Sequence, residues 1–287
     1  KLRGVLDRLQ TDAWYLHLSR DGRLFFKNVE NLKAKVATYA RNKLREQREK
    51  ELRDRLNEMF KITTRAAYQK ILALPTPDQI QLQQDTVALV VFRPADDSFR
   101  AIEEYYKHQQ YKNRVCFLTG AAKPYETVLE RAAELSAIRT IIGEMDREGI
   151  RESDPQYVEA TEIRTKLEGR FYQACRETFT ILYYPSKGGL VQVDLDPKYV
   201  ANEYKGEEQV LRALMECYKY TADITPDGNF RGRVESKLWP EEAKEVPWNS
   251  IRQRAATDPS WLWHHPDALA NLKTELVKRD VWREMMG

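Results

Sequence analysis

The chain has 287 residues, of which 42% are hydrophobic and 32% are charged, a composition typical of a charge-rich globular protein with a buried core. Its 47 lysines and arginines exceed its 44 aspartates and glutamates by only three, so any contact with nucleic acid must come from local basic patches. No apolar run approaches the roughly 18 residues of a membrane span and no signal-peptide pattern opens the sequence, which argues against a membrane protein.

The cysteines indicate a reducing compartment. Cys116, Cys175 and Cys217 lie far apart in apolar surroundings. An odd number at such wide spacing favours reduced, buried thiols over a disulfide framework. We therefore expect a cytoplasmic protein.

The first predicted element is a β-hairpin. Two aromatic-rich runs, residues 14–18 and 24–26, flank Asp21-Gly22, whose glycine supplies the positive φ of a tight turn. Residues 4–9 are predicted to be helical, so the hairpin would be the wing that ends a winged-helix domain. The chain opens on Lys1 without an initiator methionine, and we expect it to be a late part of a larger protein.

A long basic helix is predicted over residues 31–74. Apolar residues recur at helical spacing towards both ends of this segment, whereas residues 45–51 contain none. A helix that is polar on all sides usually crosses solvent between two bodies, and about 40 residues at ~1.5 Å each would form a rod of about 60 Å. Pro75 and Pro77 prevent its continuation.

The middle of the chain predicts a small α/β domain. Its strands are continuous apolar runs, typical of strands buried on both faces, and the last run pairs back antiparallel after a glycine turn. This alternation predicts a small, partly parallel sheet covered by helices. The predicted strands are residues 87–92, 115–118, 179–184 and 190–193, and the predicted helices are residues 99–109, a segment from about 125, and a segment from about 156 to 178.

The C-terminal part is predicted to be helical. One amphipathic helix carries Val210, Leu211, Leu214 and Tyr218. Five of the six tryptophans follow residue 238, and this density lets a small helical unit bury much area per residue. Two further helices are predicted at residues 248–256 and 266–279.

Together these elements predict a helix-rich, mixed α/β chain in four parts. The parts are the end of a winged-helix domain (residues 1–30), a long basic connector helix (31–75), an α/β domain (76–197) and a C-terminal helical domain rich in tryptophan (198–287).

A basic strip is the strongest candidate for a binding surface. Residues 31–70 carry twelve cations against five carboxylates, and the hairpin adds three more cations. Such a strip would follow the phosphate backbone of DNA. The alternative is a solvated helix with ion pairs at i,i+4, such as Glu46–Lys50, and both interpretations stay open. The residues expected to contact DNA are Arg20, Arg23, Lys27, Lys33, Arg41 and Lys43.

A second candidate site lies at the expected carboxyl edge of the sheet, where open α/β sheets place their ligands. Arg93, Asp96 and Asp97 follow one predicted strand, and Lys123 follows the next. The two carboxylates would hold a divalent metal, and the lysine at a helix start would hold an anion. Capping of the following helix by Asp97 or Ser98, with an ordinary strand-to-helix turn before Lys123, is the simpler interpretation.

Two common kinds of catalytic site are missing from the sequence. Nothing matches the phosphate loop GxxxxGK[ST], so this chain alone is not expected to hydrolyse ATP. None of the four histidines stands at zinc-ligand spacing from a cysteine. We predict no cofactor and no metal ion for this chain.

The order WYLH, DGR, FF and NL within residues 14–32 resembles a segment of a family of large prokaryotic P-loop ATPases with AAA+-like character. Several of its members sit in anti-phage defence islands, and the family is catalogued mainly as a domain of unknown function. Two further patterns are similar to that family: the strand beginning near Asn113, and the helical pair leading into residues 179–184. The segment Val246-Pro247-Trp248 resembles the family's small C-terminal helical unit, which is winged-helix-like. The resemblance implies an ATPase module ahead of Lys1 that uses ATP and Mg²⁺, and no ATPase residue is carried over to this sequence.

We therefore expect a non-catalytic C-terminal region of a defence ATPase. It would contact DNA or other defence-system proteins and couple those contacts to the ATPase module, with an oligomeric state that the sequence leaves open. One alternative is a metal-dependent nuclease or nucleotide-processing domain that uses Asp96, Asp97 and Lys123. Another is a protein-interaction scaffold without nucleic-acid contact.

Overall fold

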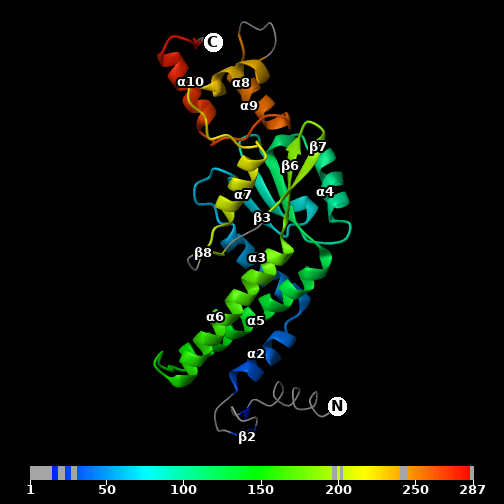
Figure 1. The fold of residues 1–287 in the computed structure, drawn as a ribbon, viewed down its shortest axis with the longest axis vertical. Helices are drawn as coiled ribbons and strands as arrows, with labels where there is room; N and C mark the ends of the chain where they lie inside the picture. Colours follow the sequence, from blue (N-terminus) through cyan, green and yellow to red (C-terminus); the bar gives the residue numbers. More distant parts are fainter. Residues whose placement is uncertain are drawn as a thin grey trace. The chain divides into compact units, whose positions relative to one another are not determined.

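The structure, a computed structural model, describes residues 15–18, 23–26, 31–195, 199–200, 203–239 and 245–284. The chain divides into two compact units, each assembled from two separate stretches. The helical unit comprises residues 1–55 and 122–178, and the sheet unit comprises residues 56–121 and 179–287. The predicted helix-rich α/β character is confirmed (Figure 1).

A five-stranded mixed sheet forms the centre of the sheet unit, in the order β3-β4-β5-β6-β7. The first three strands are parallel, β6 is antiparallel to β5, and β7 turns back antiparallel to β6. The predicted antiparallel return of the last strand is thus confirmed. The strands are β3 (Lys70–Ala73), β4 (Ala88–Val91), β5 (Val115–Thr119), β6 (Ile181–Ser186) and β7 (Gly189–Asp194).

Burial explains why the apolar runs become the central strands. Every residue of β4 and β5 is buried, because both strands lie inside the sheet with other elements over both faces. Helix α4 (Ser98–Lys107) packs on one face, where Ile102 joins a core cluster with Val90 and Phe117. Figure 1 shows α4 beside β6 and β7.

The helical unit contains a long helical pair, which the chain enters after β5 and leaves before β6. Helix α5 (Ala122–Arg147) and helix α6 (Pro155–Thr178) pack along one another, and α2 (Leu32–Arg41) packs against α5. Gly149, with a φ of 72°, lies in the connection between α5 and α6. The two separate helices predicted for this part of the chain are confirmed.

The single long helix predicted over residues 31–74 is wrong. Helix α2 ends at Arg41, a separate helix α3 (Arg45–Met59) follows, and Lys70–Ala73 form the edge strand β3. The polar stretch of α3 is also not surrounded by solvent alone. Arg45 pairs with Glu126 at 2.8 Å and Glu51 with Arg139 at 3.0 Å, so residues of α5 in the same unit supply partners that the sequence pattern did not reveal.

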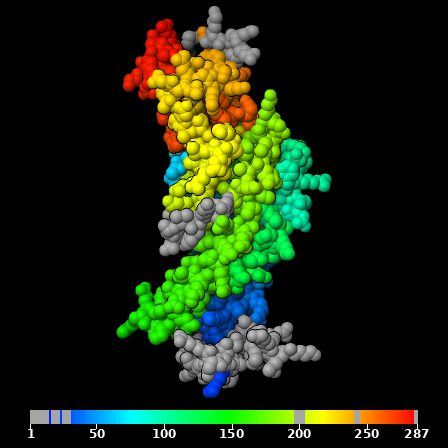
Figure 2. Space-filling view, in the orientation of Figure 1, coloured from blue at the N-terminus to red at the C-terminus, as the bar shows by residue number. Residues whose placement is uncertain are grey.

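The C-terminal part of the sheet unit is helical, as predicted. Helices α8, α9 and α10 share one core, in which Phe230, Ile251 and Leu272 are buried. The elements are the strand pair β8 (Tyr199–Val200) and β9 (Glu203–Tyr204), then α7 (Gly206–Glu216), α8 (Asn229–Lys237), α9 (Trp248–Thr257) and α10 (Ala268–Lys278). In the space-filling view, the yellow residues of α7 and the orange and red residues of the C-terminal helices form one continuous surface (Figure 2).

One helical assignment in this part is wrong. Helix α7 ends at Glu216, and Tyr218 lies beyond it with a φ of 58° and 85% of its surface exposed. Tyr218 therefore does not belong to the apolar face that carries Val210 and Leu214. Helix α8 and the pair β8–β9 were not predicted.

The predicted hairpin near the start of the chain is present as a strand pair. Strands β1 (Leu16–Leu18) and β2 (Leu24–Phe26) are antiparallel, with Leu16 opposite Phe26. The turn at Asp21-Gly22 and the helix expected at residues 4–9 lie outside the described residues. Within the described part of the chain, no helix combines the length and the apolar character needed to cross a membrane.

Candidate functional site: an arginine-lined pocket in the sheet unit

A pocket of about 400 Å³ in the sheet unit is lined by three arginines. Arg65 comes from the loop ahead of β3, Arg114 from the turn ahead of β5, and Arg252 from α9. Two carboxylates also line the pocket, so the formal positive charge exceeds the negative charge by one. The other polar lining residues are Gln69, Asp85, His264 and Asp267.

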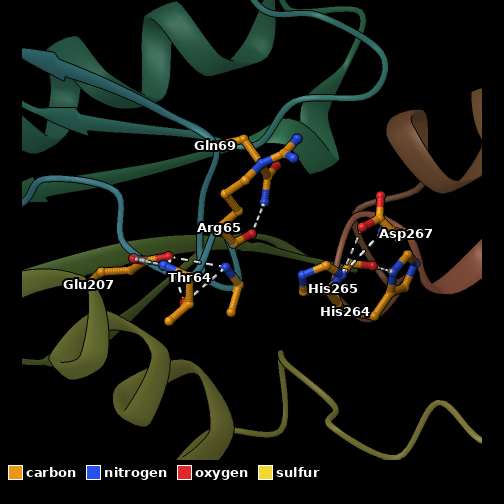
Figure 3. Close-up of polar contacts among 8 residues, drawn as sticks. Thr64, Arg65, Gln69, Glu207, His264, His265 and Asp267 are labelled. Carbon is orange, nitrogen blue, oxygen red and sulfur yellow. Dashed lines mark hydrogen bonds and ion pairs between the residues drawn. The ribbon is translucent and has the colours of Figure 1, made fainter.

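Arg65 is held in place by a carboxylate from α7. The side chain of Glu207 accepts hydrogen bonds from the backbone N–H groups of Thr63, Thr64 and Ala66 and from both threonine hydroxyls, at 2.5 to 3.0 Å. Arg65, between Thr64 and Ala66, has a φ of 60°, and this left-handed residue turns successive N–H groups towards one anion. Figure 3 shows Glu207 against this loop, with Arg65 and Gln69 beside it.

The same hydrogen bonds fix the charge of Glu207. Burial acts to raise its pKa, but the hydrogen bonds from Thr63 and Thr64 together outweigh that effect, and the pKa lies below the ordinary value. Glu207 is therefore ionised at neutral pH. The N–H groups of the loop that carries Arg65 thus bind the carboxylate of Glu207, so they are not available to an external anion.

A glycine brings α7 close enough for this contact. Gly206, the first residue of α7, lies against the ring of Phe60 and the carbonyl of Met59, and a β-carbon there would collide with both. Only glycine allows the helix start to approach so closely. The neighbouring Glu207 is thereby placed beside the loop.

Arg114 is the most buried charge in the pocket lining. Its side chain and backbone together are 8% exposed, and its Nε donates to the carbonyl of Gln84 at 2.6 Å. No described residue accepts a hydrogen bond from its two terminal nitrogens. Burial lowers the pKa of Arg114 to about 10, which Asp85 partly opposes and Arg252 reinforces. The guanidinium remains charged at neutral pH with donors available on the side of the pocket.

Arg252 is paired, but at the surface. Its guanidinium binds the carboxylate of Asp85 through two contacts, one of them from Nε to Oδ1 at 3.0 Å. Both side chains are well exposed, at 40% and 54%. An exposed pair of this kind is weak and exchanges readily with water or another anion.

A buried polar network holds α9 against the sheet and so sets the distance between Arg114 and Arg252. Asn113, which is fully buried, donates to the carbonyls of Ala255 and Trp261 at 2.8 and 3.2 Å. Its side-chain oxygen accepts from Lys219 Nζ at 2.7 Å and from Trp263 Nε1 at 3.1 Å. Asn113 therefore joins the turn ahead of β5 to α9 and to the segment before α10.

Lys219 supplies the buried amine of this network. Its Nζ donates to Asn113 Oδ1 and to the carbonyls of Pro259 and Trp261, and it lies 5.3 Å from the centre of the Trp263 ring. Burial lowers the pKa of Lys219 to about 7 against the weaker opposite effect of Asp258, and Arg114 lowers it further.

We expect the contribution of Lys219 to the stability of the sheet unit to rise as the pH increases from about 7 to about 10, against the opposite contribution of the buried Cys116 thiol, whose pKa burial raises. In this range the unfolded chain keeps the Lys219 proton, with an ordinary pKa of 10.5, while the folded chain has released it, so proton release favours folding. Urea unfolding of the wild type and of Lys219→Met at several pH values would measure this dependence. The slope of stability against pH should be more positive for the wild type than for the variant over this range, and equal slopes for the two proteins would contradict the assignment.

His264, which also lines the pocket, is neutral. Burial lowers its pKa to about 4. Its Nδ1 donates to the carbonyl of His265 at 2.8 Å, and its Nε2 accepts from Trp261 Nε1 at 3.4 Å. Figure 3 shows His264, His265 and Asp267 on the segment that precedes α10. His264 thus supports the pocket wall without adding charge at neutral pH.

The predicted DNA-contacting residues lie in the helical unit. Lys33 and Arg41 on α2 are exposed, as is Arg23 ahead of β2, whereas Lys43 is half-buried. Arg20 and Lys27 lie outside the described residues. The field of this segment is partly neutralised, since Lys35 pairs with Glu144 at 3.3 Å and Arg45 with Glu126. Whether the strip contacts DNA stays a prediction.

The predicted anion or metal site is divided between the two units. Arg93, Asp96 and Asp97 follow β4 in the sheet unit, and Lys123 is in the first turn of α5 in the helical unit. Among the residues that the structure describes, no group of three or more His, Cys, Asp and Glu side chains could hold a metal ion.

The cap ahead of α4 is made differently from the prediction. Asp97 occupies the N-cap position without a capping hydrogen bond from its side chain. The hydroxyl of Ser98 instead accepts from the N–H of Ala95 at 2.5 Å and donates to the carbonyl of Arg93 at 3.0 Å. These bonds close the loop between β4 and α4, so Ser98 has a structural role there.

The three pocket arginines could not be recognised as a group in the sequence. Arg65 was counted with the basic helix, Arg114 precedes a buried strand, and Arg252 lies on the last but one helix. No local motif joins them. The polar run Thr63-Thr64-Arg65 is the one signal of a specialised loop, and its carboxylate partner is more than 140 residues away.

Comparison with protein-family models, with curated proteins and with solved structures gives no match to this chain.

Proposed function

We propose that the sheet unit binds nucleic acid through the arginine-lined pocket, which receives phosphate groups of the backbone. The observation that carries this proposal is Arg114, a buried guanidinium whose terminal nitrogens have no acceptor among the described residues. These nitrogens are not among the fully buried unpaired atoms of the described residues, so they reach solvent on the pocket side, where an anion can replace water. Arginine suits phosphate because its planar fork donates two parallel hydrogen bonds.

Two further arginines make the pocket suitable for a polyanion and not only for a single small anion. No described residue engages the guanidinium of exposed Arg65, so it is available to a ligand. Arg252 can exchange its surface partner Asp85 for a phosphate. Contacts of this kind position a nucleic-acid backbone without reading its sequence.

The wider role that we propose follows the sequence resemblance. The chain would be a non-catalytic region of a defence-associated P-loop ATPase, and the sheet unit would supply nucleic-acid contacts that the ATPase module uses. The exposed cations Lys33 and Arg41 of α2 and the β1–β2 hairpin, acting as a wing, would add contacts from the helical unit. The antiparallel register of β1 and β2 supports the wing, and the ring of pocket arginines supports the nucleic-acid contact.

Substitution of Arg65 by glutamine should weaken nucleic-acid binding by roughly three- to tenfold at moderate salt. It should also reduce the slope of log affinity against log salt concentration by about one, because one phosphate contact is lost. Fluorescence anisotropy of a labelled oligonucleotide over a salt series would measure both effects. Arg100→Gln is the matched control, because Arg100 is exposed on α4 of the same unit and does not line the pocket. Equal losses for the two variants would mean that the pocket has no special role.

A further inference from the structure

A second pocket, of about 470 Å³, adjoins the arginine-lined pocket and is lined by three tryptophans. Trp239 follows α8, Trp248 begins α9, and Trp282 follows α10. Trp248 belongs to the lining of both pockets, and its neighbours on α9 divide between them: Ile251 lines the tryptophan pocket and Arg252 the arginine-lined pocket.

The tryptophans of this region fall into two classes. Trp261 and Trp263 are each 2% exposed and belong to the interior of the sheet unit. Trp239, Trp248 and Trp282 are only half-buried, and they pack against the same helical core while lining the pocket. Core packing therefore accounts for only part of the surface of Trp248 and Trp282, and both residues also line the pocket.

The three rings form a continuous aromatic wall. The Trp239 and Trp282 ring centres are 5.5 Å apart and the Trp248 and Trp282 centres 6.5 Å apart, with the planes tilted by 51° and 59°. Lys273 Nζ lies 5.6 Å from the centre of the Trp248 ring and pairs with Glu284 at 2.5 Å. Because the indole of Trp282 donates to Glu235 at 2.9 Å, its ring is fixed in orientation.

We propose that the tryptophan pocket receives a base of single-stranded nucleic acid while the adjoining arginines hold its phosphate. This inference rests on the proposed function and adds to it the form of the ligand. Every nucleobase has an aromatic face that stacks on tryptophan, and aromatic platforms beside a basic groove are typical of proteins that bind single strands. Bases of a duplex are stacked on each other and are not available for such contact.

The charge of the adjoining arginine-lined pocket favours a nucleotide over an apolar partner. The tryptophan pocket is lined by two cations, Lys273 and Arg283, and by two carboxylates, Glu245 and Glu284, whereas the adjoining arginine-lined pocket has an excess of positive charge. An apolar peptide would contact the tryptophan rings but would give the arginines no anion to bind. An inorganic anion would bind the arginines but would leave the tryptophan rings without a contact. A base joined to a phosphate satisfies both pockets through their shared residue, Trp248.

The first test uses the wild-type chain and three labelled probes of equal length: oligothymidine, an abasic oligodeoxynucleotide and a duplex. We expect oligothymidine to bind at least tenfold more tightly than the abasic strand, because stacking is lost with the base. Tryptophan fluorescence should be quenched by oligothymidine only. Equal affinity for oligothymidine and the abasic strand would overturn the base pocket and leave the phosphate site standing, whereas failure of all three probes would overturn the proposed function itself.

The second test separates the two pockets by substitution. Trp248→Leu should lower the affinity for oligothymidine about tenfold with little change for the abasic strand, and Arg65→Gln should lower both. Phe99→Leu is the matched control, because Phe99 is an exposed aromatic residue outside both pockets. Circular dichroism checks the fold of each variant, and if Trp248→Leu does not fold, Lys273→Gln at the same wall replaces it. If Trp248→Leu lowers the affinity for the abasic strand as much as the affinity for oligothymidine, the inference is contradicted. Repeating the measurement with oligouridine in place of oligothymidine distinguishes RNA from DNA.

Discussion

Replacement of Asn113 by alanine should lower the free energy of unfolding by about 3 kcal/mol, the largest effect that we expect from a single side chain. The amide makes four hydrogen bonds inside the protein. Its loss leaves the carbonyl of Ala255 without this donor and Lys219 with one acceptor fewer. Buried groups that lose their partners keep the full cost of removal from water, so the loss exceeds that of an average hydrogen bond.

Urea unfolding followed by circular dichroism measures this prediction, and Asn249→Ala is its control. Asn249 is exposed on the same unit and accepts one hydrogen bond, from Gln84, at 2.9 Å, so its replacement should cost less than about 0.5 kcal/mol. Asn113→Ala should also weaken oligonucleotide binding, since α9 carries Arg252 and Trp248 and is held to the sheet by this amide. Similar stabilities for the two variants would show that the network contributes little.

Replacement of Glu207 by glutamine should lower the free energy of unfolding by roughly 2 to 3 kcal/mol. The carboxylate accepts five hydrogen bonds, from the backbone and hydroxyls of Thr63 and Thr64 and from the N–H of Ala66. An amide has one acceptor oxygen and places N–H groups where donors already point. The loop would open, and Arg65 would lose its fixed position in the pocket.

Acid titration provides a second measure of this contact. Because the folded pKa of Glu207 is depressed, its contribution is complete above the unfolded value of 4.5 and is lost as the pH falls through the lower folded value. The wild type should therefore lose stability in this range more steeply than Glu207→Gln. Glu208→Gln, which removes only the exposed pair with Lys205, should behave like the wild type. A steep acid loss retained in Glu207→Gln would refute the assignment.

These two contacts connect stability to the proposed binding site. Glu207 fixes the loop of Arg65, and Asn113 fixes the helix of Arg252. Arg114 lies next to Asn113 in the same turn. The pocket is therefore held by groups that do not line it themselves, and variants of those groups should alter binding in proportion to the loss of loop or helix order.

The sequence was sufficient for the elements whose pattern is local. The apolar runs at residues 87–92 and 115–118 predict strands buried on both faces, and β4 and β5 are buried throughout. Helical periodicity predicts α5, α6, α9 and α10, and the glycine-containing turn predicts the antiparallel return of β7. In each case burial of one contiguous apolar segment decides the structure, so that neighbours in the chain carry the information.

The tertiary structure alone decided the course of residues 31–74 and the composition of the pocket. Lys70–Ala73 became a strand because β4 offers it a parallel partner 18 residues further along the chain, which outweighs its helical pattern. The polar stretch of α3 found its partners on α5, about 80 residues away. Arg65, Arg114 and Arg252 converge for the same reason, because the contacts of Glu207 and Asn113 that bring them together join residues more than 140 positions apart. Charge and spacing along the chain determine which residues can bind phosphate, and long-range hydrogen bonds determine which of them do so together.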